Sequence, residues 1–268
     1  MVKRYEDPEI LVIWGDDNKL KLWQNTELAV LKARVDLGQL DKPSFSAISN
    51  ALAEKPFDLN FWRAREAEII HDLQAFVEER KRHLPVELQP LFHKDLTSYD
   101  VEEPAFTRML LQSVGLVISH LSNLESVVEN QALKYRYTLM MGRTHGQEAE
   151  LQTLGKRFLT WLADLRLDER NLLGFSNRLE YSKISGAIGN YGSIEPELEK
   201  KALKNIGLAP YVGATQIMPR EFYAPVAQSL AQIVLTLDKI ATAIRLGARS
   251  GRPIYQEPFN KKQDIPKE

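Results

Sequence analysis

A short segment, Met140 to Gln147, contains the side chains best suited to move a proton. Its sequence, MMGRTHGQ, places Arg143, Thr144 and His145 between two glycines. An imidazole ordinarily titrates near neutral pH, so a histidine held in such a turn can give a proton to a reacting group or take one from it. We predict that two long helices converge here and that the tight turn between them positions His145 for proton transfer.

Thr97, Ser98 and Asp100 form a second polar group, directly before a long stretch with helical periodicity. Each of these residue types favours the N-cap position, so the group could serve only to start that helix. A helix N-terminus with free N–H groups and nearby hydroxyls is also well suited to bind a carboxylate. The sequence supports both interpretations equally.

Three other polar segments carry weaker signals. His71 and Asp72 are adjacent within an expected helix, where neighbours point about 100° apart and need not act together. Lys183 opens a ten-residue stretch with three glycines, which allows the backbone to approach another group closely but contains no nucleotide-binding glycine motif. Arg4 and Tyr5 could contact a phosphate and a ring, although a solvated tail is the simpler interpretation.

The composition excludes several classes of function. The 268 residues are 44% hydrophobic and 26% charged with a formal net charge of −1, so nothing favours binding to nucleic acid or to an acidic membrane surface. The sequence has no cysteine, which excludes disulfides, a thiolate nucleophile and zinc sites built on sulfur. No signal peptide or membrane span is recognisable, and we expect a cytoplasmic protein.

Apolar residues at helical spacing dominate the chain and predict an all-α fold. Apolar residues recur every three or four positions along three long helices. They extend over 106–128 in the first helix, over 151–179 in the second, and over 222–244 in a third that is expected to run from about Arg220 to Arg249. Each of these helices should be about 40 Å or more in length. Helices of this length need neighbours, so the bundle should be completed by association with other chains.

Shorter helices are expected in the N-terminal part, after an irregular start. They are 25–38 with Thr26 as the cap, 44–54, and 58–82. Pro85 and Pro90 interrupt the pattern, and we place a domain boundary between them. The predicted organisation is a small N-terminal helical domain, 1–88, an incomplete central long-helix bundle, 89–250, and a polar segment, 251–268.

Taken together, these segments resemble the adenylosuccinate lyase family of the fumarase/aspartase superfamily. The similarity covers nearly the whole chain, and the matching segments occur in the family's order. They are Lys3 to Glu9, Ile13 to Trp23, His71-Asp72, Leu96 to Val101, Met140 to Gln147, Lys183 to Gly189, and Thr215-Gln216 with Arg220.

The resemblance implies a β-elimination that releases fumarate from adenylosuccinate, leaving AMP, and from the succinylated carboxamide ribotide of purine biosynthesis. His145 matches the family's general acid, and His71 matches a residue that supports binding and catalysis near it. No cofactor or metal is implied. Sites in the superfamily are shared between subunits, so we expect a homotetramer with a nucleotide substrate and no nucleic-acid or membrane partner.

The other matched residues are expected to bind the substrate. They are Arg4, Tyr5, Asp72, Thr97, Ser98, Lys183, Gln216 and Arg220. Thr97 and Ser98 match residues that hold the succinyl carboxylates. Arg4 and Tyr5 match nucleotide contacts, and Gln216 matches a contact to a substrate amide.

The chain also departs from the family. Asp95 occupies a position that is usually glycine, Leu151 one that is proline, and Phe222 and Tyr223 stand where many members have arginine and histidine. The resemblance identifies 251–268 as the start of a mobile catalytic loop that reads roughly GSSxMPxKxNP in the family. That loop supplies the serine base, its sequence is absent from these residues, and the base is therefore expected to be missing.

Two alternatives stay open. The chain could be a non-catalytic helical association protein, or a truncated remnant that lacks the catalytic base. It could also be a sibling lyase acting on argininosuccinate, aspartate or malate, although the RTHGQ sequence and the Arg4-Tyr5 pair favour a nucleotide substrate.

Overall fold

The computed structural model describes residues 2–251 and 253–256, which are predominantly helical, so the predicted all-α class is confirmed. The chain divides into two compact units, Met1–Ile118 with Leu173–Val226 and Ser119–Leu172 with Ala227–Glu268. These units interleave along the chain, and the predicted boundaries at 88 and 250 stay predictions. Most of the predicted start of the catalytic loop, 251–268, lies outside the described residues.

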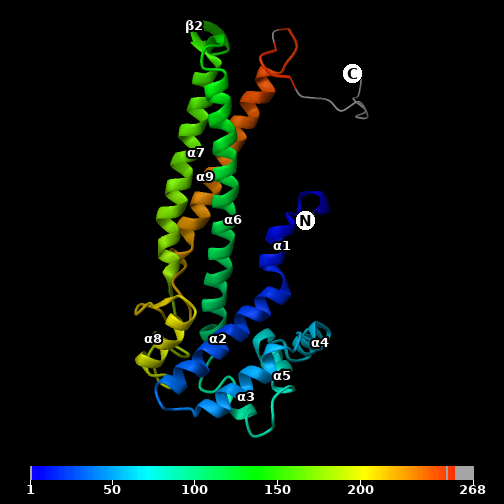
Figure 1. The fold of residues 1–268 in the computed structure, drawn as a ribbon, viewed down its shortest axis with the longest axis vertical. Coiled ribbons are helices and arrows are strands. Elements are labelled where there is room, and N and C mark those ends of the chain that lie inside the picture. The colour runs from blue at the N-terminus through cyan, green and yellow to red at the C-terminus, as the bar shows by residue number, and fades with distance from the viewer. Residues whose placement is uncertain (1, 252, 257–268) are drawn as a thin grey trace. The chain divides into compact units, whose positions relative to one another are not determined.

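A series of helices forms the N-terminal part of the first unit (Figure 1). They are η1 Lys3–Tyr5, α1 Pro8–Trp14, α2 Asp16–Asp36, α3 Lys42–Ala53, α4 Leu59–Ile69, α5 Asp72–Lys81 and η2 Gln89–Leu91. Asp7, Asp41 and Asp58 begin three of them, because each carboxylate accepts backbone N–H groups of the first turn.

Three expectations for this region are wrong. Helix α2 begins at Asp16, and Thr26 lies inside it, where its hydroxyl donates to the Leu22 carbonyl at 3.0 Å. The single helix expected at 58–82 is two helices, because Ile70 adopts a φ of 55° and breaks the backbone. The segment from Lys3 to Glu9, expected to be irregular, contains η1 and the first two residues of α1. Apolar spacing continues across the break at Ile70, so periodicity alone does not reveal it.

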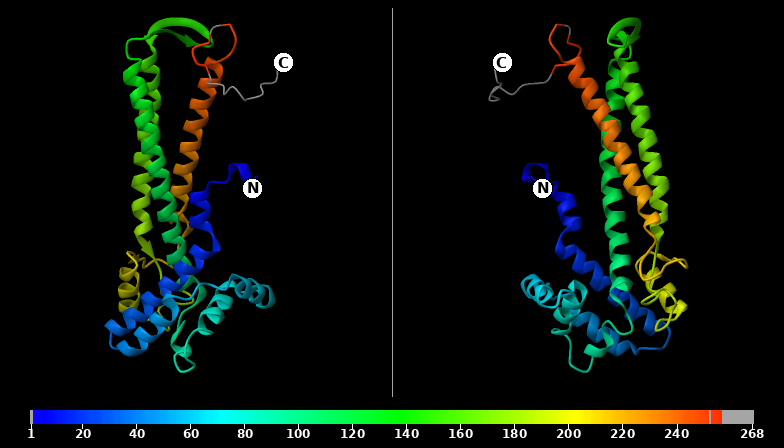
Figure 2. Two further views of the ribbon diagram at one scale, coloured as in Figure 1. Left: turned by 45° about the vertical axis from the view of Figure 1, so that its right-hand side comes forward. Right: turned by 180° about the vertical axis from the view of Figure 1, so that it is seen from behind.

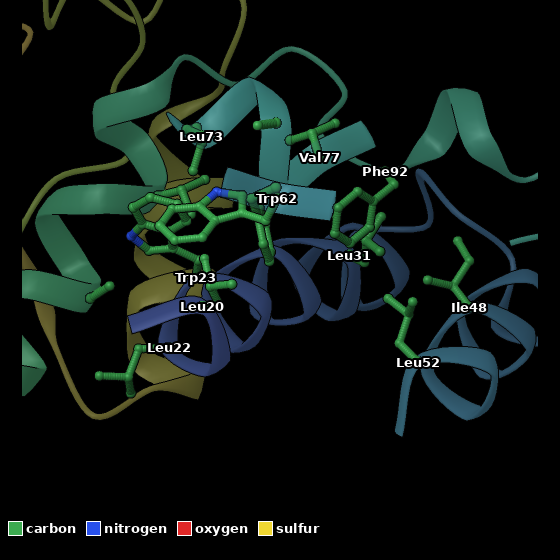
Figure 3. Close-up of a cluster of buried hydrophobic side chains, with 14 of the residues drawn as sticks. Leu20, Leu22, Trp23, Leu31, Ile48, Leu52, Trp62, Leu73, Val77 and Phe92 are labelled. Atoms are coloured by element: carbon green, nitrogen blue, oxygen red, sulfur yellow. The ribbon is translucent and has the colours of Figure 1, made fainter. Parts of the chain in front are cut away.

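The main buried apolar cluster of the first unit joins α2 to α3, α4 and α5 (Figure 3). Trp23 of α2 packs edge-on against Phe76 of α5 with ring centroids 5.5 Å apart, and Phe92 lies 6.2 Å from the same ring. Other buried members are Leu20, Leu31, Ile48, Leu52, Trp62, Leu73 and Val77. Burying each such side chain contributes about 1.5–3 kcal/mol, so this cluster sets the positions of α4 and α5.

The rest of the first unit consists of the start of α6, the end of α7 and the elements that follow α7. Its elements are the start of α6 Ser98–Lys134, the end of α7 Leu154–Ser176, η3 Asn177–Glu180, β3 Tyr181–Ser182, α8 Pro196–Asn205, β4 Ala209–Pro210 and η4 Arg220–Phe222. Strands β3 and β4 pair in parallel, with Tyr181 opposite Ala209. A second buried cluster, which includes Val30, Ala33 and Leu198, packs α8 against α2.

A β-hairpin joins α6 to α7 in the second unit (Figure 2). Its strands are β1 Leu139–Thr144 and β2 Gln147–Thr153, and the unit also contains most of α9 Ala224–Gly247. The turn predicted between two helices is therefore a hairpin turn, and α7 begins at Leu154 rather than at Leu151, where the expected apolar stretch begins. Both strands are largely exposed, so they carry no alternating apolar pattern that the sequence could have revealed.

The long helices differ in length from the expectation. Helix α6 has 37 residues, about 55 Å at 1.5 Å per residue, whereas α7 and α9 have 23 and 24 residues and reach only about 35 Å. None of the helices in the described part of the chain combines the length and the apolar character needed to cross a membrane.

Candidate functional site

A polar hollow, here called the first hollow, lies where α4 ends and where α5 and α6 begin. Its volume is about 740 Å³, and its lining residues include His71, Asp72, Ser98, Tyr99 and Glu102. Three of the predicted site residues, His71, Asp72 and Ser98, therefore meet at one place. The fold brings together two motifs that are separate in the sequence.

His71 is held by hydrogen bonds at both ring nitrogens. Its Nδ1 accepts the backbone N–H of Gln74 at 3.1 Å, which caps α5. Its Nε2 lies 3.2 Å from Ser98 Oγ. Because Nδ1 is used as an acceptor, a neutral imidazole carries its proton on Nε2 and can donate it to the serine oxygen. The Ser98 proton is then left for a bound carboxylate.

Buried Asp100 organises the turn that carries Thr97 and Ser98. Its Oδ2 accepts the Thr97 backbone N–H at 2.8 Å and the Thr97 hydroxyl at 2.9 Å. Its Oδ1 accepts Lys183 Nζ at 2.6 Å and the Gly186 N–H at 3.0 Å. Thr97 and Lys183 thus use their polar groups to hold the turn, and neither lines the first hollow. Their predicted contacts with substrate stay predictions.

The second hollow, about 520 Å³ in volume, shares Asp72, Tyr99 and Glu102 with the first and is otherwise lined mainly by aromatic and charged side chains. Burial, followed by the charges of Asp72 and Glu103, raises the pKa of Glu102 to about 7. Glu102 can therefore exchange a proton near neutral pH. Its sequence position gives no signal, because a glutamate near the start of a helix is ordinary.

Arg220 also lines the second hollow, where it pairs with a buried carboxylate. Its Nη1 lies 3.0 Å from Glu103 Oε1, and the Tyr223 hydroxyl donates to Glu103 Oε2 at 2.6 Å. Burial and this hydrogen bond raise the pKa of the Tyr223 hydroxyl, which therefore stays protonated. The Arg220 side chain is 55% exposed, so its guanidinium keeps donors available for a second anion.

Asp95 lies in a left-handed turn with a φ of 63°, which explains why a glycine was expected at this position. Aspartate tolerates this conformation better than most residues. Arg34 Nη2 donates to Asp95 Oδ2 and to the Lys94 carbonyl, both at 3.0 Å. The negative charge that Asp95 brings to this position is therefore paired with Arg34.

Arg4, Tyr5 and Gln216 are exposed and line neither hollow. The Arg4 guanidinium lies over the Tyr5 ring at 4.8 Å from its centroid. Gln216 lies in the loop between β4 and η4. Their predicted nucleotide contacts stay predictions.

His145 belongs to the second unit and lies at the tip of the hairpin. Thr144 pairs with Gln147, so His145 and Gly146 are the two turn residues, with φ values of 53° and 77°. Positive φ at both positions is the pattern of a type I′ turn. The imidazole is exposed, and no hydrogen bond to it is found within the described part of the chain. Its role as the general acid stays a prediction.

The chain matches the family model described as Lyase over residues 21–263. It is 34% identical to the adenylosuccinate lyase of Synechocystis sp. and 32% identical to that of Aquifex aeolicus, over 263 residues in each case. Each match covers 98% of this chain and 60% of the relative. The chain therefore spans about 60% of the length of these curated relatives.

Solved structures of lower identity share the fold. A fumarate lyase from Mesorhizobium sp. BNC1 superposes with a TM-score of 0.86 at 21% identity, covering 91% of this chain and 58% of that one. The 3-carboxy-cis,cis-muconate lactonizing enzyme from Pseudomonas putida superposes with a TM-score of 0.83 at 23% identity, covering 91% and 57%. At these identities the similarity concerns the arrangement of the helices and not the reaction.

Proposed function

This chain belongs to the lyase family, and from that premise we propose that it serves the β-elimination of fumarate from adenylosuccinate. The names of its curated relatives support this reaction. The observation that carries the proposal is the contact between His71 and Ser98 at the start of α6. It presents a serine hydroxyl and a helix N-terminus to one polar hollow, which suits a substrate carboxylate.

In this elimination a base removes a proton from the carbon beside the C–N carbon. The electron pair left behind forms the double bond of fumarate, the C–N bond breaks, and an acid protonates the departing nitrogen. We assign the acid to His145, the carboxylate contact to Ser98, the orientation of the Ser98 hydroxyl to His71, and the support of the turn that carries Ser98 to Thr97. The same steps on the succinylated carboxamide ribotide would release fumarate in purine biosynthesis.

The nucleotide part of the substrate is assigned to Arg4, Tyr5 and Gln216, with Arg220 as a further anion contact. We propose a cytoplasmic homotetramer whose sites combine residues of several subunits. Exposed apolar side chains on α9 support burial against another chain; they include Val234, Leu235, Ile244 and Leu246.

Complementation tests this proposal. This chain is mixed with an adenylosuccinate lyase relative whose acid histidine has been inactivated, and fumarate release from adenylosuccinate is followed. We expect activity in the mixture and its loss when this chain carries His145→Ala. A mixture that releases no fumarate would contradict the proposal and favour the non-catalytic association protein.

Ser98→Ala tests the carboxylate contact in the same mixture. Removing a hydroxyl that binds a charged group costs about 1.5–3 kcal/mol, so KM should rise roughly ten-fold or more. Ser126→Ala is the matched control, because Ser126 lies on the same helix with its hydroxyl bonded to the Ser122 carbonyl. An unchanged KM for Ser98→Ala would remove Ser98 from the site.

A further inference from the structure

A third concave surface on the first unit, here called the basic groove, shares no residue with the two hollows. It lies between α2, the start of α6 and the end of α8, and its volume is about 700 Å³. Its lining contains three cations, Lys21, Lys32 and Arg108, and no carboxylate. A concave surface with this charge attracts anions.

The cations are spread along the groove. Lys21 and Lys32 are separated by 11 residues of α2, about three helical turns, so they lie on the same face about 16 Å apart along the axis. Arg108 belongs to α6, and Gln112 follows it by one turn. An elongated ligand with more than one anionic group would reach more of these cations than a single phosphate ion would.

The donors of the groove are available. Within the described part of the chain, Lys21, Lys32 and Arg108 form no ion pair. Gln112 Oε1 accepts Asn18 Nδ2 at 3.0 Å, which leaves the Gln112 amide N–H groups for a ligand. A guanidinium can bind two phosphate oxygens at once, and lysines add point charges.

We propose that the basic groove binds an organic polyphosphate, with phosphate groups on Arg108 and the α2 lysines. Phe45 is partly buried in the lining and offers an apolar surface for a ring. The volume lies within the roughly 300–1,000 Å³ that is usual for small-molecule sites. None of these residues takes part in the proposed elimination, so the two proposals can fail independently.

Calorimetric titration of the purified chain tests this site, with inorganic tripolyphosphate in one arm and ATP in the other. We expect both probes to bind, and Arg108→Gln and the double variant Lys21→Gln with Lys32→Gln each to weaken binding about ten-fold or more. Lys156→Gln, which removes an exposed lysine from α7, should leave it unchanged. Absence of binding at millimolar probe, or equal binding by Arg108→Gln, would overturn the proposal.

Two further variants separate this groove from the candidate active site and from a general loss of folding. Ser98→Ala should leave tripolyphosphate binding unchanged, and a parallel loss would overturn the assignment to the basic groove. Arg108→Lys should bind more tightly than Arg108→Gln, because the charge is kept. Phe45→Leu should weaken the binding of ATP and leave the binding of tripolyphosphate unchanged. An ATP affinity equal to that of the parent chain would overturn the ring contact.

Discussion

In the first unit, the hydrogen bonds of His71 and the pKa of Glu102 are set by the groups around each side chain. The His71 imidazole is fixed by a backbone N–H on one nitrogen, so its other nitrogen is committed to Ser98. Glu102 is held in a partly buried position beside two other carboxylates, Asp72 and Glu103, and its pKa is raised accordingly. Burial beside these carboxylates therefore gives Glu102 a higher proton affinity than its residue type alone would predict.

Glu102 makes stability depend on pH in a definite direction. Its pKa rises from 4.5 to about 7 on folding, so the folded chain holds this proton more tightly than the unfolded chain does. The stability associated with the proton is fully present below pH 4.5 and is lost as pH rises through about 7. Glu102→Gln should therefore be more stable than the parent at pH 8, by about 1 kcal/mol after allowance for solvent exposure.

Urea denaturation of the parent and of Glu102→Gln at pH 5 and pH 8 measures this difference. The exposed residue Glu87 provides the control, since Glu87→Gln should follow the parent at both pH values. If the advantage of Glu102→Gln did not grow from pH 5 to pH 8, the raised pKa would be contradicted.

At the scale of elements, the hairpin and the helices that flank it depend on close backbone contacts. Gly155 in the first turn of α7 is buried, and a Cβ there would lie 2.5 Å from the Ala132 carbonyl oxygen and 2.6 Å from Arg136 Cα. Gly174, on the same helix, is exposed and has open space around it. The same substitution should therefore act in opposite directions at the two positions.

Gly155→Ala forces backbone apart and should destabilise the chain by about 1–3 kcal/mol, the usual cost of overpacking. Gly174→Ala removes backbone freedom from a helix interior and should stabilise it by about 0.5–1 kcal/mol. Urea midpoints and hydrogen exchange of the α7 amides measure both changes. Shifts of the same sign would refute the close contact between α6 and α7 at Gly155.

At the scale of the whole chain, distant segments are joined by buried charges. Lys183 and Asp100 are 83 positions apart and both fully buried, and their ion pair connects the 183–186 loop to the start of α6. Removing one partner leaves an uncompensated buried charge. Asp100→Asn or Lys183→Met alone should therefore cost about 3–5 kcal/mol.

The double variant, Asp100→Asn with Lys183→Met, removes both charges and should cost clearly less than the sum of the two single changes. A double-mutant cycle by urea denaturation measures this coupling. Additive single effects would show that the two groups do not stabilise each other.

Most of the fold class was predictable from the sequence, because helical periodicity depends on local residue order. The three long helices and the α3 region follow from apolar spacing and turn residues. Periodicity did not predict three features. They are the beginning of α2 at Asp16 rather than at 25, the break at Ile70, and the hairpin. Each depends on contacts or on a positive φ that periodicity does not encode.

The candidate site was also predictable in part, because its motifs depend on local residue order. The sequence by itself determined the all-α class, the ordered motifs and the family, since these rest on residue types and their order along the chain. Only the tertiary structure decided that His71 meets Ser98, that Lys183 is buried against Asp100, that Glu102 titrates near neutral pH, and that His145 lies in a hairpin turn. These properties arise from desolvation and from pairings between distant segments, which exist only once the chain has folded.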